Sequence, residues 1–348
     1  MHMADALISP AVGGVMWAAT AGLIAFSSKK IKQELDDRKV PLMGVLGAFI
    51  FASQMINFTI PATGSSGHLG GGMILAILLG PYAAFLVMAS VLTVQAFFFA
   101  DGGLLALGCN IFNLGFFPCF VAYPLIFKRM VKGHESRDRI LISALVAAVI
   151  GLQLGAFSVV LETLFSGISE LSFGTFVLLM QPIHLAIGIV EGLVTAAVVG
   201  FVWKARPEMV TAPEKAPEEK SSLRTILIGL SIAALVTGGA LSWFASSSPD
   251  GLEWAMFKTS GSEELENKNK VHESLAHIQE KTAFLPDYGF KADESKQEGN
   301  EESSETWPAV NSGTSVAGLV GGVLTLLLAV IIGFALKRLG KKKNHAAQ

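Results

Sequence analysis

The sequence predicts an all-α protein whose helices cross a membrane several times. Apolar residues make up 51% of the chain and charged residues only 16%. Apolar stretches of about 18–25 residues recur along it, which is the length that a helix needs to cross a bilayer. The formal net charge is -2, so the composition gives no electrostatic support for a nucleic-acid partner. These observations together favour a multi-pass protein of a lipid bilayer.

The first 205 residues contain enough apolar sequence for a bundle of seven helices. Gly80 and Pro81 interrupt one apolar stretch and divide it into two helices, of which the first is short and broken. The last helix of the bundle is long and ends before Arg206. The predicted helices cover residues 10–26, 41–58, 72–79, 81–99, 104–127, 140–164 and 173–203.

A second module is predicted after this bundle. Residues 206–222 are rich in Pro, Glu and Lys and form a cytoplasmic linker that is polar enough to be disordered. The module at 223–340 then contains two apolar helices, at 223–244 and 316–336. Between them lies a polar, acidic loop, 246–310, so we expect a two-helix domain with one long outer loop.

The distribution of basic residues predicts the orientation of the chain. Of the 26 Lys and Arg residues, 20 fall in four segments that lie on one and the same side of the membrane if the predicted helices cross it in turn. The other six lie in the long loop. Because Lys and Arg accumulate on the cytoplasmic side of membrane proteins, we predict an N-terminus outside and a C-terminus inside. Nine crossings of the cell (inner) membrane fit this pattern. The basic segments are 29–39, 128–139, 204–224 and 337–343.

The chain begins with Met1-His2, and His68 lies in a loop that the predicted orientation places on the same outer side. A terminal amine, the amide nitrogen of residue 2 and its imidazole can close adjacent chelate rings on one ion, and a fourth nitrogen completes a square. Square-planar nitrogen sites suit Ni(II) and Cu(II). We therefore predict a metal site at Met1, His2 and His68. The alternative is that His2 is incidental and His68 an ordinary loop residue.

Three polar residues lie around the predicted turn between the fourth and fifth helices: Gln95, Asp101 and Asn110. Asp101 should lie on the outer side, where a carboxylate can attract a cation or hold an imidazole in its metal-binding tautomer. It could equally cap the N-terminus of the next helix. All three are candidates to support the metal site without ligating the ion.

A polar stripe runs along the seventh helix, where Gln181, His184 and Glu191 share one face with Gly188. Polar groups inside membrane helices are expensive and invite a functional interpretation. The stripe either passes an ion inward or forms an interhelical hydrogen-bond network, and we favour the network for Gln181 and His184. Glu191 is expected to orient helices and not to ligate metal.

Other candidate residues receive structural interpretations. His272 and His277 of the acidic loop either collect metal weakly or lie on a solvated face, and we favour the solvated face. Glu162 is expected to be a surface group that reaches out of the bilayer. Cys109 and Cys119 are interpreted as small buried hydrophobic residues and not as a disulfide pair.

Catalytic signatures are absent from the sequence, which contains no phosphate-binding Gly-x-x-x-x-Gly-Lys-Ser/Thr loop and no His-Glu-x-x-His pair. The chain is therefore not expected to be an enzyme or to hydrolyse ATP by itself. The main rival function is a stand-alone secondary transporter or channel. It would need a polar path across the bilayer, for which the stripe at 181–191 is the best candidate, and the inverted repeats typical of such proteins are not evident.

The opening MHMADALISP resembles that of the CbiM/NikM family, the substrate-capture membrane components of energy-coupling-factor importers for cobalt and nickel. Similar motifs follow in the same order over residues 1–205, and the segment 223–340 resembles the small CbiN/NikN partner subunit, less well over 258–281. The shared motifs are PLMGVLGAFIF at 41–51, GSSGH at 64–68, LGP at 79–81, QAFFFADGG at 95–103, LGCN at 107–110, IVEGLVT at 189–195, SPDGLE at 248–253 and PDYG at 286–289.

This resemblance implies a transport role in which Ni(II) or Co(II) is the substrate and no cofactor is needed. It implies partners as well, namely cytoplasmic ATPase subunits and a transmembrane coupling subunit. The implied ligands are the amine of Met1, the amide and imidazole of His2, and His68, with the first ten residues folded inward as a plug. Gly67 before the histidine favours nickel. Because the loop 246–310 resembles a separate subunit, we expect its deletion to impair uptake and leave equilibrium binding nearly intact.

Overall fold

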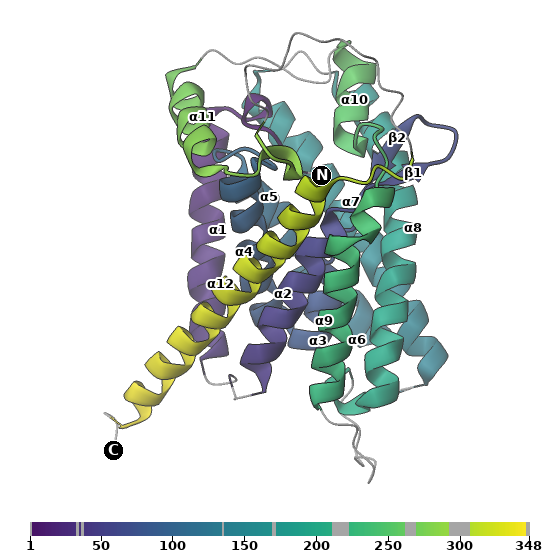
Figure 1. The fold of residues 1–348 in the computed structure, drawn as a ribbon, viewed down its shortest axis with the longest axis vertical. Helices are drawn as coiled ribbons and strands as arrows, with labels where there is room; N and C mark the ends of the chain where they lie inside the picture. Colours follow the sequence, from purple (N-terminus) through teal and green to yellow (C-terminus); the bar gives the residue numbers. More distant parts are fainter. Residues whose placement is uncertain are drawn as a thin grey trace.

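The computed structural model describes residues 2–32, 35, 38–133, 136–168, 172–210, 223–261, 269–291 and 307–345. The described chain is almost entirely helical, with one two-stranded hairpin, which confirms the all-α fold class (Figure 1). The first part of the bundle consists of α1 (Pro10–Ile31), α2 (Lys39–Gln54), α3 (Gly72–Leu79) and α4 (Pro81–Val94), which a π-helical stretch extends from Gln95 to Phe99.

The rest of the bundle follows the predicted order. A broken helix begins as α5 (Leu107–Ile111), widens into a π-helical stretch over Phe112–Phe127 and ends as α6 (Lys128–Val131). The two prolines inside that stretch, Pro118 and Pro124, lack a backbone N–H, so the hydrogen-bond pattern of an ideal α-helix cannot be completed there. The long helices α7 (Arg137–Ser166) and α8 (Phe173–Ala205) pack against each other along their length.

The C-terminal module packs onto this bundle. Its two long helices are α9 (Leu223–Gly239) and α12 (Ser312–His345), and both contact α2. Two further helices, α10 (Gly251–Ser260) and α11 (Lys270–Thr282), lie within the segment for which the sequence predicts only a polar loop. In Figure 1 α10, α11 and the hairpin lie at one end of the bundle, and the C-terminus lies at the other.

Six helical segments are long and apolar enough to cross a membrane, and α2 and α9 are shorter apolar helices. The segment built on α4 is central, with 78% of its most apolar window buried in the protein, whereas α1 has only 17% buried. The outer helices instead expose large apolar side chains such as Leu178 and Ile331. Such surfaces are stable only in contact with lipid, and the chain is an integral, multi-pass membrane protein.

The hairpin is the main departure from the predicted elements. The helix expected to reach residue 58 ends at Gln54, and β1 (Phe58–Ile60) pairs antiparallel with β2 (Ser65–Gly67). The physical reason lies in Ile60-Pro61, because a residue before proline is forced out of the helical region into extended backbone. The turn then uses left-handed backbone at Ala62 and Gly64, with φ of 64° and 76°.

Candidate metal centre

The N-terminal segment folds into the end of the bundle and is held there by Asn110. The Met3 amide donates to Asn110 Oδ1 at 2.8 Å, and Asn110 Nδ2 donates back to the Met3 carbonyl at 3.2 Å. The same carbonyl accepts the Gly103 amide at 2.9 Å, and the side chains of Met3, Leu7 and Ile8 are fully buried. The described part of the segment is therefore a plug, as the resemblance implies. Met1 itself lies outside the described residues.

The loop that carries His68 is fixed by a chain of polar contacts from inside the bundle. Glu191 accepts the amides of two consecutive glycines, Gly70 at 2.9 Å and Gly71 at 3.1 Å. Gln54 donates to the Gly70 carbonyl at 2.8 Å, and Gln95 in turn donates to Gln54 at 2.9 Å. Gln95 and Glu191 thus act on the loop backbone, so the structure places both as supports of the His68 loop.

His2 and His68 meet at the inner end of the plug. Their rings are stacked, with centroids 4.8 Å apart and planes 7° from parallel. A metal–imidazole bond is about 2 Å long and lies in the ring plane, so the two rings are close enough to share one ion once a ring turns its nitrogen toward it. Both side chains are buried: His68 is 7% exposed, and so is the His2 side chain.

The protonation state of His68 suits metal binding. His68 Nδ1 contacts the Leu69 carbonyl at 3.0 Å, which makes Nδ1 the donor and leaves the lone pair on Nε2. Burial lowers the pKa of His68 to about 3, so its ring is neutral at physiological pH. Neutral imidazole is the form that ligates metal ions.

Asp101 contacts the second histidine. His2 Nδ1 lies 3.1 Å from Asp101 Oδ1, and the Tyr288 hydroxyl donates to Asp101 Oδ2. Burial alone would raise the pKa of this carboxyl, but the contact with His2 and the hydrogen bond from Tyr288 hold the pKa below its usual value. The helix that follows begins at Leu107 with Ala106 at its cap position. The helix-cap interpretation of Asp101 is therefore wrong, and the imidazole contact is what the structure shows.

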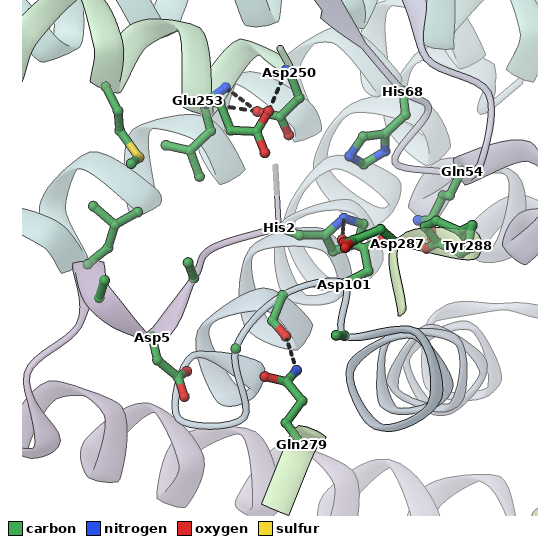
Figure 2. A pocket seen from close by; sticks show the side chains of 18 of the residues that line it. His2, Asp5, Gln54, His68, Asp101, Asp250, Glu253, Gln279, Asp287 and Tyr288 are labelled. Carbon is green, nitrogen blue, oxygen red and sulfur yellow. Dashed lines mark hydrogen bonds and ion pairs between the residues drawn. The ribbon is translucent and has the colours of Figure 1, made fainter. Parts of the chain in front are cut away.

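A cavity of about 510 Å³ opens beside the two histidines. Figure 2 shows His2 and His68 at its wall, Asp101 against His2, and Asp250 with Glu253 on the other side. Five carboxylates line it, and this negative charge favours a cation. They are Asp5, Asp101, Asp250, Glu253 and Asp287.

Much of the cavity wall comes from the C-terminal module, and we call this part the roof: residues 248–260, Lys270–Thr282 and Pro286–Tyr288. The roof is joined to the His68 loop through Ser66, whose amide donates to the Pro249 carbonyl at 2.8 Å and whose hydroxyl donates to the Ser248 carbonyl at 2.7 Å. Trp254 Nε1 adds a bond to the Thr63 carbonyl at 2.9 Å. The SPDGLE motif thus packs directly on the hairpin that precedes His68.

The helix α10 begins with a capping box, which fixes the motif's two carboxylates. Asp250 accepts the amides of Leu252 and Glu253, and the Glu253 side chain accepts the Asp250 amide at 2.9 Å. This Asp-x-x-Glu spacing is a sequence signature of a helix start. It was the available signal for α10, which sequence reasoning missed.

The structure corrects the interpretation of His272. The residue is 5% exposed, and its Nε2 contacts the carbonyls of Asp5 at 3.0 Å and Ile8 at 2.9 Å, so it holds the plug. Its neighbour His277 has a side chain that is 62% exposed, which confirms the solvated interpretation for that residue. On the same helix, Gln279 donates to the carbonyls of Ala96 and Gly102.

We expect His272→Ala to weaken metal binding by about three- to tenfold, because the lost hydrogen bonds are each worth ~1 kcal/mol and hold the segment that carries His2. His277→Ala on the same helix is the matched control and should bind as the unaltered chain does. Equilibrium titration of both purified variants measures the difference. Equal affinities would show that the plug does not depend on α11.

The same contacts reverse the expectation for the long loop. Since the roof bonds to the plug, to the hairpin and to Asp101, replacing residues 246–310 by a short Gly/Ser linker should weaken equilibrium metal binding about tenfold or more. Titration of the shortened chain beside the full chain measures it. An unchanged affinity would restore the view that the loop acts only in uptake.

Two further interpretations are settled by burial. Glu162 is buried, accepts from Asn113 at 2.7 Å and from Ser158 at 3.3 Å, and is not a surface group as expected. The physical reason is that the amide of Asn113, from the neighbouring helix, satisfies the carboxylate inside the bundle. Cys109 and Cys119 are buried and free, as predicted.

Within the described ranges, no group of three or more His, Cys, Asp or Glu side chains could hold a metal ion. The fold and this histidine pair at the end of a membrane bundle define a class of protein, the metal transport components of membranes.

The comparisons with known proteins identify the family. Residues 2–209 match the family model for CbiM, the cobalt uptake substrate-specific transmembrane region, and residues 224–338 match the PDGLE domain. The chain belongs to the CbiM family and carries a C-terminal PDGLE domain.

Relatives share this two-part organisation. A protein of Archaeoglobus fulgidus, provisionally named fused nickel transport protein NikMN, is 33% identical over 97% of this chain and 98% of its own length. The fused nickel transport protein NikMN of Rhodobacter capsulatus is 32% identical over 73% of this chain and 75% of its own. A crystal structure of a truncated transition metal transporter matches with a TM-score of 0.53 and 30% identity over 59% of this chain and 99% of its own. The chain is a metal transport component and not an enzyme.

Proposed function

We propose that this chain is the substrate-capture component of an energy-coupling-factor importer and that it binds Ni(II) or Co(II) from outside the cell. The proposed ligands are the Met1 amine, the His2 amide and imidazole, and His68. The observation that carries the proposal is the buried, near-parallel pair of His2 and His68 rings 4.8 Å apart at the wall of an acidic cavity. No cofactor is required, since the ion is the cargo.

The chelate constrains which nitrogen of His2 binds the ion. A ring that includes the amide nitrogen of His2 closes with six members only through Nδ1, and in the structure Nδ1 faces Asp101 Oδ1 at 3.1 Å. Nε2 of the same ring is buried and has no hydrogen-bond partner in the part of the chain that the structure describes. A half-turn of the imidazole exchanges its two edges within nearly the same space. We infer that loading of the ion turns the ring in this way and frees Nδ1 from Asp101.

The metal is proposed from the chemistry and from the relatives. Planar nitrogen coordination suits Ni(II), and two relatives that cover most of this chain carry nickel in their names. The family model is named for cobalt uptake. We therefore propose nickel as the principal substrate and cobalt as the alternative.

The energy for uptake is proposed to come from other proteins, because the sequence contains no phosphate-binding loop. The partners would be cytoplasmic ATPase subunits and a transmembrane coupling subunit in the cell membrane. In this arrangement the plug and the roof face outward and the C-terminus faces the cytoplasm. The two family matches support a division into a capture domain at 1–205, a cytoplasmic linker at 206–222 and a second domain at 223–340.

Metal loading of the purified chain with its native N-terminus tests the proposal. After nickel and cobalt are offered together, we expect one bound Ni(II) with the yellow, diamagnetic signature of a square-planar site. Bound cobalt on the same ligands would leave the proposed site standing and make cobalt the substrate. A chain that binds neither ion would refute the proposed function. Metal transport by the chain alone in sealed vesicles would favour the rival, a stand-alone secondary transporter.

A further inference from the structure

Another histidine lines a small void that it shares with His68. His184 belongs to α8 and is 1% exposed. Its Nδ1 lies 2.8 Å from the Met180 carbonyl, one helical turn earlier, so Nδ1 carries the proton and Nε2 carries the lone pair. Nε2 is buried and has no hydrogen-bond partner among the described residues.

This state of His184 is unexpected for a residue that only joins helices. A buried polar atom without a partner costs about 1–3 kcal/mol, so the hydrogen-bond network favoured from the sequence does not account for Nε2. Ring nitrogens of metal ligands, in contrast, commonly point a lone pair at the ion while the other nitrogen donates to a backbone carbonyl. His184 already has that arrangement, with Met180 as the carbonyl partner.

His68 and His184 line the same small void of about 10 Å³. His68 also lines the large cavity, so it lies between the two spaces. A volume of this size is close to that of a single water molecule or one bare ion. Apart from the histidines, glycines and aliphatic side chains surround the void, and its polar side-chain nitrogens are therefore those of His68 and His184.

The glycines make this close approach possible. A Cβ atom at Gly67 would come within 2.4 Å of Ile187, and one at Gly251 would come within 2.4 Å of Ile183 and 3.4 Å of His184 Cε1. Larger residues at either position would therefore push α8 away from the His68 loop. The backbone of this region is built to keep His184 beside His68.

We propose that His184 is a second metal ligand, which takes the ion from His68 as it moves inward from the planar site. The inference rests on the proposed function and adds to it the first step of the release path. His68 would be a ligand at both positions, so the ion stays bound to the His68 imidazole while its other ligands are exchanged. Two imidazoles hold an ion more weakly than the planar set does, and a transit position has to bind weakly enough for the ion to leave.

The test isolates the second position by removing the first. In the full-length His2→Ala variant with a native N-terminus, titration with Co(II) should show residual binding about 1,000-fold weaker than in the unaltered chain. Adding His184→Gln should abolish that binding, whereas adding His277→Ala, a change at an exposed histidine, should not. Gln keeps the volume and polarity of the side chain, and a monodisperse elution profile checks that each variant folds.

The single variant His184→Gln gives the second readout. Its equilibrium affinity at the planar site should stay within about threefold of the unaltered chain, while metal uptake by cells that carry the complete transporter falls about tenfold or more. Absence of residual binding in His2→Ala, or unchanged uptake in His184→Gln, would overturn the inference and leave the planar site standing. An unaltered chain that binds no metal would remove the proposed function first, and the inference with it.

Discussion

Adding one residue before Met1 is expected to abolish tight metal binding as completely as His2→Ala or His68→Ala. The extension converts the terminal amine into an amide and moves it away from the imidazole, so the first chelate ring cannot close. The two substitutions each remove a ring nitrogen from the buried pair whose centroids lie 4.8 Å apart. We expect an affinity loss of about 1,000-fold or more in each case, or ~4 kcal/mol.

Isothermal titration with Ni(II) measures these losses, and the same residue added after Gln348 is the matched control. A chain that keeps its affinity with an N-terminal extension would show that the amine is not a ligand. If His68→Ala alone kept its affinity, the ion would have to be held by the N-terminal segment without the loop.

Glu191→Ala is expected to lower the metal affinity at least about tenfold and to lower the Tm of the metal-free chain. The substitution leaves the amides of Gly70 and Gly71 buried without an acceptor, at ~1–3 kcal/mol each. The His68 loop can then satisfy them only by moving. Glu191→Gln keeps one carbonyl acceptor, so its metal affinity and Tm should lie between those of the unaltered chain and those of Glu191→Ala.

The control for Glu191 is Gln153→Ala, which removes a partly buried interhelical hydrogen bond, to the Gln181 carbonyl at 2.9 Å, that does not touch the loop. It should lower the Tm without lowering the affinity. If Glu191→Ala binds metal as tightly as the unaltered chain, the two glycine amides do not position His68.

The membrane helices could be predicted because their signal is local. Apolar runs of sufficient length, interrupted at Gly80-Pro81 and at the polar linker, determine where helices begin and end. The hairpin was missed because the apolar run continues to Phe58, past the actual helix end at Gln54. Only Ile60-Pro61 marks the extended backbone there, and a single dipeptide is a weak signal against a long apolar run.

The candidate site could be predicted only where the residue type itself indicates the chemistry. His2 and His68 could be paired because a terminal chelate needs one further nitrogen. The supports were harder to place, since Asn110, Gln54 and Glu191 act on backbone atoms whose positions depend on the tertiary fold. Sequence reasoning named Gln95, Asn110 and Glu191 as candidates but missed Gln54, and it could not assign their partners.

The roof was hidden for a different reason. The face of α11 that meets the bundle carries His272, Leu275 and Gln279, at helical spacing, and two of these three residues are polar. The helix is mostly polar, and its apolar positions Val271, Leu275 and Ile278 predict a different face from the one used, since Val271 and Ile278 are 41% and 46% exposed. Its partners are main-chain carbonyls of the plug and of the π-helical stretch, which no pattern of side chains reveals.

The roof and the cavity that it covers belong to one polypeptide, which changes how strongly they need to attract each other. A tethered partner is present at an effective concentration on the order of millimolar, whatever the abundance of the protein. Weak polar contacts such as those of Ser66 with Ser248 and Pro249 are then sufficient to keep the roof closed most of the time. If the roof detaches, the tether keeps it near the cavity, whereas two separate subunits with the same contacts would have to find each other again by diffusion.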